Sequence, residues 1–328
     1  MDSAERTHMN ATATATIRLD KVRKEFGSTV AVGELSLEIE AGELVMLIGP
    51  SGCGKSTVLR MINRLIEPTS GRMYLGSDEI TAADPVALRR RIGYVIQNVG
   101  LFPHQTIHDN VATVPRLVGW DKARTNARVD ELLTLVGLEP QRFAKRYPHE
   151  LSGGQRQRVG VARALAADPV VLLMDEPFSA VDPIVRGRLQ DEFLRLQATV
   201  GKTIVFVTHD VDEAVRLGDR IAVLSEGGKL EQYATPAELL SKPANSFVAD
   251  FVGADRGIKR LAVTTIPTAG LSAADPAGPV VNSTETLRDA LAALLEGTTG
   301  TVNVQRDGQL LGSLSIEDIY TTLRAAAA

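Results

Sequence analysis

The chain has 328 residues, a hydrophobic fraction of 44%, a charged fraction of 23% and a formal net charge of -4. This length suits one large domain with a small one, or two domains, and the composition is that of a globular chain. The charge argues against a nucleic-acid partner, because phosphate backbones select a basic domain or stripe. The single cysteine, Cys53, excludes a disulfide within the chain.

The sequence contains no apolar run near the roughly 18 residues that a membrane-spanning helix needs. Residues 1–15 carry acids early and lack the apolar core of a signal peptide, so we expect a disordered leader there. We therefore expect a cytosolic chain that reaches a membrane only through a partner.

The first predicted elements are strands over residues 17–22, 35–39 and 44–48, rich in alternating or continuous apolar residues. Phe26 falls in the turn after the first of these strands. An exposed aromatic ring at this point can stack on a purine ring, and a hydrophobic plug is the alternative.

A glycine-rich loop, GPSGCGKST, follows the strand at 44–48 and precedes an apolar helix start. Its glycines let successive backbone N–H groups point at one anion, and the helix adds its positive N-terminal end. A lysine then supplies charge for the β- and γ-phosphates, and a serine offers a hydroxyl to Mg²⁺. The residues predicted to bind the phosphates are Gly49, Ser51, Gly52, Cys53, Gly54, Lys55, Ser56 and Thr57. The strand–loop–helix context favours a nucleoside triphosphate site over a plain turn.

Two further loops carry candidate groups. A buried strand over residues 92–96 ends at Gln97, where open α/β sheets place ligands. A helical insert follows and ends at LSGGQ, residues 151–155. Ser152 suits a helix N-cap, and Gly153 and Gly154 leave backbone N–H groups accessible, which predicts a second anion site.

The buried strand over residues 170–174 ends in two adjacent carboxylates, Asp175 and Glu176. Such a pair is costly in a buried position unless it faces a metal or a reaction. Asp175 is expected to hold Mg²⁺, and Glu176 to orient or deprotonate an attacking water. A last buried strand over 203–207 leads to His209, which we expect near the γ-phosphate.

Together these segments resemble the ATP-binding subunit of an ABC transporter over about residues 16–250, with a helical subdomain over about 98–155. The resemblance implies an α/β fold: a P-loop core with a mixed or parallel sheet, an antiparallel β subdomain and the helical subdomain. It implies ATP and Mg²⁺ as ligands, with Ser56, Gln97 and Asp175 at the metal and Glu176, Gln97 and His209 in catalysis. Phe26 matches the adenine-stacking position, where tyrosine is commoner, and Asp182 matches the D-loop acid.

The family resemblance also implies a head-to-tail dimer. Ser152, Gly153, Gly154 and Gln155 of one copy would cap the nucleotide held by the other copy. ATP would close this dimer and hydrolysis would open it. The implied partners are transmembrane permease subunits, a second copy of the chain and, indirectly, an extracytoplasmic solute-binding protein, at the cytoplasmic face of the membrane.

Residues 93–120, above all PRLVGW at 115–120, resemble the subgroup that imports glycine betaine, choline and carnitine. This is an association, because these residues are expected to face the permease. An importer of another solute remains an alternative. So does a soluble ABC ATPase that acts on DNA, ribosomes or cofactor assembly, although the coiled-coil or zinc insertions and tandem cassettes of such proteins are missing.

The C-terminal part, residues 281–328, follows an expected linker over 251–280 and predicts a helix, a two-stranded hairpin and a last helix. It resembles one CBS motif, a small α+β half, through Gly312-x-x-Ser315-x-x-Asp318. In that family the serine and the aspartate contact an adenosine ribose. The same pattern is also a helix N-cap with an acid in the first turn, so both interpretations stay open.

Overall fold

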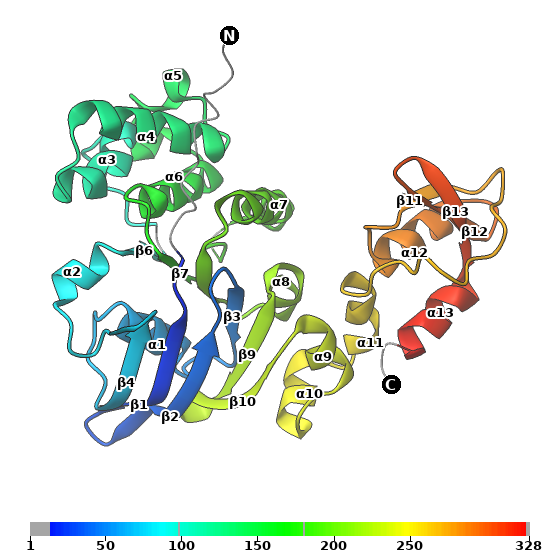
Figure 1. Ribbon diagram of the computed structural model, residues 1–328, viewed down its shortest axis with the longest axis horizontal. Coiled ribbons are helices and arrows are strands. Elements are labelled where there is room, and N and C mark those ends of the chain that lie inside the picture. Colours follow the sequence, from blue (N-terminus) through cyan, green and yellow to red (C-terminus); the bar gives the residue numbers. More distant parts are fainter. Residues whose placement is uncertain (1–13, 98, 180, 326–328) are drawn as a thin grey trace, which may run out of the picture. The chain divides into compact units, whose positions relative to one another are not determined.

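The computed structural model describes residues 14–97, 99–179 and 181–325 (Figure 1). The leader expected over residues 1–15 lies almost wholly outside this part of the chain. The chain divides into two compact units. The first contains the residues up to His209 together with Leu224–Leu230, and the second contains the rest.

The first unit is built on parallel strands. They are β3 (Leu44–Ile48), β6 (Ile92–Val95), β7 (Val171–Asp175) and β8 (Thr203–Val207), in the order β3-β8-β7-β6. Every residue of β3, β7 and β8 is buried. Continuous apolar runs of this kind are typical of parallel strands covered on both faces, and the strands predicted from them are confirmed.

An antiparallel sheet joins the same unit. It contains β1 (Ile17–Phe26), β2 (Thr29–Ile39), β4 (Ser70–Leu75) and β5 (Asp78–Glu79), in the order β2-β1-β4-β5. Both β1 and β2 extend well beyond the strands predicted at 17–22 and 35–39. The β1–β2 register shifts three times between Leu19 and Glu25, and such irregularities break the two-residue alternation that marks a strand in sequence.

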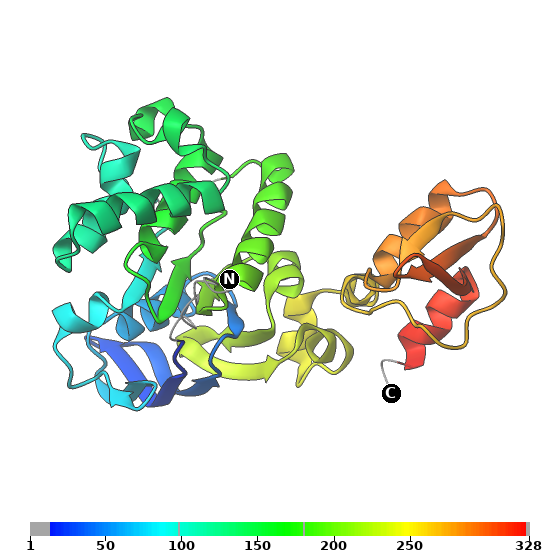
Figure 2. The same ribbon diagram turned by 45° about the horizontal axis from the view of Figure 1, so that its top comes forward.

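The helices of the first unit include a separate group. They are α1 (Lys55–Ile62), α2 (Pro85–Arg89), α3 (Ile107–Leu117), α4 (Lys122–Leu135), α5 (Pro140–Phe143), the 3₁₀ turn η1 (Pro148–Glu150), α6 (Gly153–Leu165) and α7 (Pro183–Val200). Of these, α3, α4 and α6 pack on one another. In both views this group stands to one side of the strands, as expected for the helical insert (Figures 1 and 2).

The second unit begins with α8 (Val211–Leu217). The neighbouring strands β9 (Arg220–Ser225) and β10 (Lys229–Ala234) cross the division between the units, with the turn η2 (Glu226–Gly228) between them. Then come α9 (Pro236–Ser241), α10 (Ser246–Val252), α11 (Arg256–Lys259) and η3 (Arg260–Ala262).

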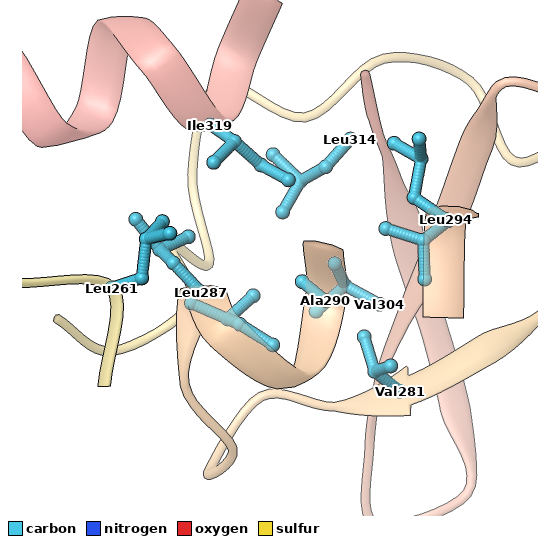
Figure 3. Packing of buried hydrophobic residues seen from close by; sticks show 10 residues of the cluster. Leu261, Val281, Leu287, Ala290, Leu294, Val304, Leu314 and Ile319 are labelled. Atoms are coloured by element: carbon cyan, nitrogen blue, oxygen red, sulfur yellow. The ribbon is translucent and has the colours of Figure 1, made fainter. Parts of the chain in front are cut away.

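The C-terminal part of the second unit forms a small α+β body with its own core. Its elements are β11 (Val280–Asn282), α12 (Leu287–Glu296), β12 (Thr301–Arg306), β13 (Gln309–Ser315) and α13 (Ile316–Ala325). Strand β12 pairs in parallel with β11 and antiparallel with β13. Side chains from both helices and the strands meet in the core (Figure 3).

Part of the segment expected as a linker packs on this body. Leu261 and Ile266 belong to its core cluster. The buried Asn303 amide donates to the carbonyls of Asp275 (2.7 Å) and Gly278 (3.0 Å) and accepts from the Asp275 N–H (2.9 Å). Residues 271–279 therefore lie over the polar face of the small sheet.

No helix in the described part of the chain is both long enough and apolar enough to cross a membrane.

Candidate active site

The glycine-rich loop connects β3 to α1, and its backbone needs glycine at several positions. Gly49, Gly52 and Gly54 have φ angles of 149°, 81° and 107°. A Cβ at Gly49 would lie 2.1 Å from the Leu224 carbonyl oxygen, and one at Gly54 would lie 2.4 Å from the Ala31 oxygen. A Cβ at Gly52 would meet open space, so there only the φ angle favours glycine.

Lys55 is the first residue of α1 and is only 6% exposed. Its ammonium group donates to the carbonyl oxygens of Gly49 (2.8 Å) and Pro50 (2.9 Å) and lies 3.8 Å from Cys53 Sγ. The charge is thus held across the loop, beside the positive end of α1, whose first turn has no acidic residue. This arrangement is suited to an anion.

The other loop residues predicted to bind phosphate surround this lysine in sequence. Ser51 and Gly52 are exposed, Ser56 and Thr57 are half-buried, and the Cys53 side chain is buried. The loop therefore presents an exposed side to a ligand and keeps its thiol buried.

Ser56 and Asp175 come from α1 and the end of β7 and meet directly. The Ser56 hydroxyl donates to Asp175 Oδ1 at 2.8 Å, and Asp175 is 6% exposed. Burial raises the pKa of the Asp175 carboxyl, and the Ser56 hydrogen bond and the charges of Arg60 and Lys55 act in the opposite direction. Neighbouring ligands of an octahedral Mg²⁺ lie about 3 Å apart, so these two oxygens fit adjacent positions around one ion.

Glu176 follows directly in a strained backbone conformation, with a φ of 45°. Its N–H donates to the Val207 carbonyl at 3.0 Å, which fixes it at the end of the parallel sheet. The Gln97 amide donates to Glu176 Oε2 at 3.1 Å, and His209 Nδ1 lies 3.3 Å from the same oxygen. The structure thus brings the three predicted catalytic residues together at adjacent strand ends. A strained residue held by its surroundings in this way is common at functional sites.

The LSGGQ residues form a capping box at the start of α6. The Ser152 hydroxyl accepts from the Gln155 N–H (3.3 Å), and the Gln155 side chain accepts from the Ser152 N–H (3.0 Å). A Cβ at Gly153 would meet open space, and one at Gly154 would make ordinary contact with Leu189. Within the described residues, no hydrogen bond or ion pair joins residues 152–155 to the glycine-rich loop at 49–57, the phosphate loop, of the same chain.

Two predicted residues lie apart from the catalytic group. Phe26 ends β1 and is 51% exposed, with Lys24 Nζ 4.8 Å from its ring centre. A ring this exposed is no plug for the core of its own chain. Asp182 is exposed, and its carbonyl accepts from the Arg186 N–H at the start of α7 (2.8 Å).

Two further residues belong to this site although no sequence motif predicted them. Arg60 acts on the Asp175 carboxyl through its charge. Its position four residues after Ser56 on the predicted helix is the signal that points to it, because such residues share a helix face. The Ser179 hydroxyl donates to the Glu176 carbonyl at 2.9 Å and steadies the strained backbone, a turn contact that has no sequence signal of its own.

The chain is similar to known proteins of one family. A family model described as "ABC transporter" matches residues 32–179. Over 312 residues the chain is 47% identical to the carnitine transport ATP-binding protein OpuCA of Listeria monocytogenes. This alignment covers 94% of this chain and 77% of that protein. It is 46% identical over 305 residues to the glycine betaine uptake system ATP-binding protein YehX of Escherichia coli, covering 92% and 98%.

A solved structure shares the fold of about two thirds of this chain. The ATP-binding cassette MJ0796, a dimer in a post-hydrolysis state bound to ADP and phosphate, superposes with a TM-score of 0.60 at 36% identity. The match covers 67% of this chain and 98% of that one. It confirms the predicted P-loop core with an antiparallel β subdomain and a helical subdomain.

Proposed function

Because the chain belongs to the family of ABC transporter ATP-binding proteins, we propose that it hydrolyses ATP to power an importer of quaternary-amine osmoprotectants such as glycine betaine, choline or carnitine. One observation carries the catalytic part of this proposal. One carboxylate oxygen of Glu176 accepts from Gln97 and lies beside His209 Nδ1. The preceding residue, Asp175, is bound to Ser56 of the glycine-rich loop.

We assign the residue roles from these contacts together with the family to which the chain belongs. Lys55 and the loop N–H groups bind the ATP phosphates, and Phe26 stacks on the adenine. Ser56, Asp175 and Gln97 would hold Mg²⁺, which would neutralise charge that develops on the phosphate oxygens. Glu176 orients the attacking water and accepts its proton, and His209 lies beside it near the γ-phosphate.

The LSGGQ residues Ser152–Gln155, called the signature residues below, act on a second copy of the chain. The Ser152–Gln155 turn presents its first N–H groups outward from α6 and is not linked to the phosphate loop within the described chain. We assign Ser152, Gly153, Gly154 and Gln155 to the nucleotide of the other copy, and Asp182 to the D-loop. ATP then closes a head-to-tail dimer and hydrolysis reopens it, since only the triphosphate binds both copies well.

The proposal includes the surroundings of the protein. The importer adds permease subunits, which hold the chain peripherally at the cytoplasmic face of the membrane, and an extracytoplasmic solute-binding protein. Within the chain, the ATPase domain spans about residues 16–250, and residues 281–328 form a single CBS-like motif joined through 251–280. The names of two relatives, for carnitine and glycine betaine, support the substrate class.

Uptake measurements test this function. Cells without their own osmoprotectant uptake would carry the permease and binding protein with either the wild-type chain or Glu176→Gln. After an osmotic upshift, labelled glycine betaine and choline should enter only the wild-type cells. Equal uptake with an expressed variant whose purified ATPase activity is lost would refute the quaternary-amine importer. An importer of another solute, or a soluble ABC ATPase, would then be the better description.

A further inference from the structure

Arg163 on α6 binds the backbone at Val99 and Gly100, two and three residues after Gln97. Arg163 Nη1 donates to the Gly100 carbonyl at 2.6 Å, and Nη2 donates to the Val99 carbonyl at 2.6 Å. A guanidinium group has a planar fork of donors, so it can hold two adjacent carbonyl groups at a fixed orientation. The loop at 99–100 and the helix therefore move together wherever this fork stays intact.

The same loop is strained and fits α6 closely. Val99 has a φ of 31°, in the left-handed region that β-branched residues rarely occupy. Its side chain lies over Gly160, where an added Cβ would come within 2.6 Å of Val99 Cγ1. Gly160 and Arg163 are three residues apart, on one face of α6. Side-chain packing and the arginine fork thus hold the loop from the same side.

The charge on Arg163 is used in an unusual way. No acidic side chain among the described residues lies within ion-pair distance of it, and burial lowers the pKa of its guanidinium. For stability alone, an apolar side chain of similar size would avoid the cost of burying this charge. The partly buried Arg163 guanidinium instead forms two hydrogen bonds that fix the backbone at Val99 and Gly100.

The two ends of this arrangement are both functional under the proposed ATPase role. Gln97 lies two residues before Val99 and donates to Glu176. Ser152 is the N-cap of the helix that carries Arg163, and the two residues are ~16 Å apart along a straight helix. A displacement of the signature end would therefore be passed through α6 to the loop that orients Gln97.

We propose that Arg163 is a positioning residue that couples the signature end of α6 to the catalytic carboxylate, by holding the loop that presents Gln97 to Glu176. In this role it would contact neither ATP nor the attacking water. Its effect appears in the rate of hydrolysis once the signature residues of a second copy have engaged the nucleotide. This inference rests on the proposed ATPase function.

The test is a double-mutant cycle on the purified full-length chain with ATP and Mg²⁺. Steady-state kinetics would give kcat and KM, and single-turnover rates with enzyme in excess would extend the range for slow variants. The variants are Arg163→Ala, Arg163→Lys, Gln97→Ala and the double variant Arg163→Ala/Gln97→Ala. Arg158→Ala is the matched control, because Arg158 also lies on α6 but contacts the Val136 carbonyl and Glu192.

We expect Arg163→Ala to lower kcat about tenfold with KM within about twofold, since small misplacements of catalytic groups cost rates of this order. Arg163→Lys should recover part of the rate, and Arg158→Ala should keep the wild-type rate. In the Gln97→Ala background, Arg163→Ala should cost less than about twofold, because the shared route is already lost.

Independent, multiplicative losses from Arg163→Ala and Gln97→Ala would overturn the coupling. So would a loss that appears only in KM, or an equal loss in Arg158→Ala. A wild-type chain that does not hydrolyse ATP would instead refute the proposed function itself. Melting curves with and without ATP would identify any variant that fails to fold, and Arg163→Lys then carries the comparison.

Discussion

The Gln97 amide donates a 3.1 Å hydrogen bond to the Glu176 oxygen that also lies 3.3 Å from His209 Nδ1. These residues follow β6, β7 and β8, three adjacent parallel strands. Their meeting is therefore a property of the strand order, since the carboxyl ends of parallel strands reach the same edge of a sheet. The orientation of the proposed base depends on neighbours on both sides.

Glu176→Gln should reduce ATP hydrolysis by about 100-fold or more, because an amide of similar size cannot accept the proton. Binding of ATP and Mg²⁺ should persist, since the phosphate loop and Asp175 are unchanged. The variant should then accumulate as a closed dimer. Size-exclusion chromatography in saturating ATP-Mg²⁺ checks this, and a monomer there would contradict the base role.

Asp175→Asn should stabilise the chain when nucleotide and Mg²⁺ are absent. Burial raises the pKa of Asp175, so the folded state favours the protonated carboxyl. The stability contribution of Asp175 is then full below the ordinary carboxyl pKa, about 4, and is lost as the pH rises through the raised pKa. The melting temperature of the variant should exceed that of the wild type by about 2–4 °C at pH 8, and by less at pH 5.

The same variant should lose Mg²⁺-dependent ATP hydrolysis. Melting curves in EDTA at the two pH values, paired with ATPase assays in Mg²⁺, measure both effects. A variant that is less stable at pH 8 would show that the Ser56 hydrogen bond outweighs the cost of burying the charge.

Gly49→Ala and Gly52→Ala should differ sharply, although both positions have positive φ. At Gly49 the new methyl group would overlap the Leu224 carbonyl, so we expect a loss of about 3 kcal/mol or more in the free energy of unfolding. At Gly52 there is open space, and backbone strain alone should cost about 1 kcal/mol. Urea denaturation of both variants checks the order, and equal losses would count against the packing argument.

Ser315→Ala tests the two interpretations of the C-terminal motif. Asp318 Oδ2 accepts from the Ser315 hydroxyl (2.7 Å) and N–H (2.8 Å), and the hydroxyl accepts from the Asp318 N–H (3.2 Å). Both side chains thus serve as a helix cap, so the substitution should cost about 1 kcal/mol of stability. Thr322→Ala is the control, because its hydroxyl donates to the Asp318 carbonyl inside α13 and takes no part in the cap.

Nucleotide binding separates the interpretations further. In the Lys55→Ala variant the glycine-rich loop should no longer bind ATP. Adding Ser315→Ala to this variant should then leave the binding of a fluorescent ATP analogue unchanged. Binding that disappears with Ser315→Ala would assign the motif to a ribose contact.

Much of the core could be predicted because its signals are local. Continuous apolar runs gave β3, β7 and β8, and the glycine pattern gave the loop before Lys55. The Ser152 cap is equally local, since a serine and a glutamine three residues apart satisfy each other's backbone. Gln97 and Glu176 could each be placed at a strand end, but the hydrogen bond between them needs the strand order of the folded sheet.

Other features had no local signal. The left-handed backbone of Glu176 depends on the Val207 carbonyl, which lies 31 residues further along the chain. The full lengths of β1 and β2 were hidden by register shifts. The packing of residues 261–279 on the C-terminal body depends on Asn303, whose amide completes hydrogen bonds for a distant segment rich in small residues.

Asn303 also determines where the chain can be divided for experiments. A fragment that started at residue 281 would omit Leu261, Ile266 and the segment over the polar face of the small sheet. Its exposed backbone and unpaired Asn303 amide would favour aggregation over folding. A fragment that starts before Arg256 keeps Leu261, Ile266 and the segment that packs over the polar face of the sheet. An isolated C-terminal domain for spectroscopy or fusion should therefore begin there.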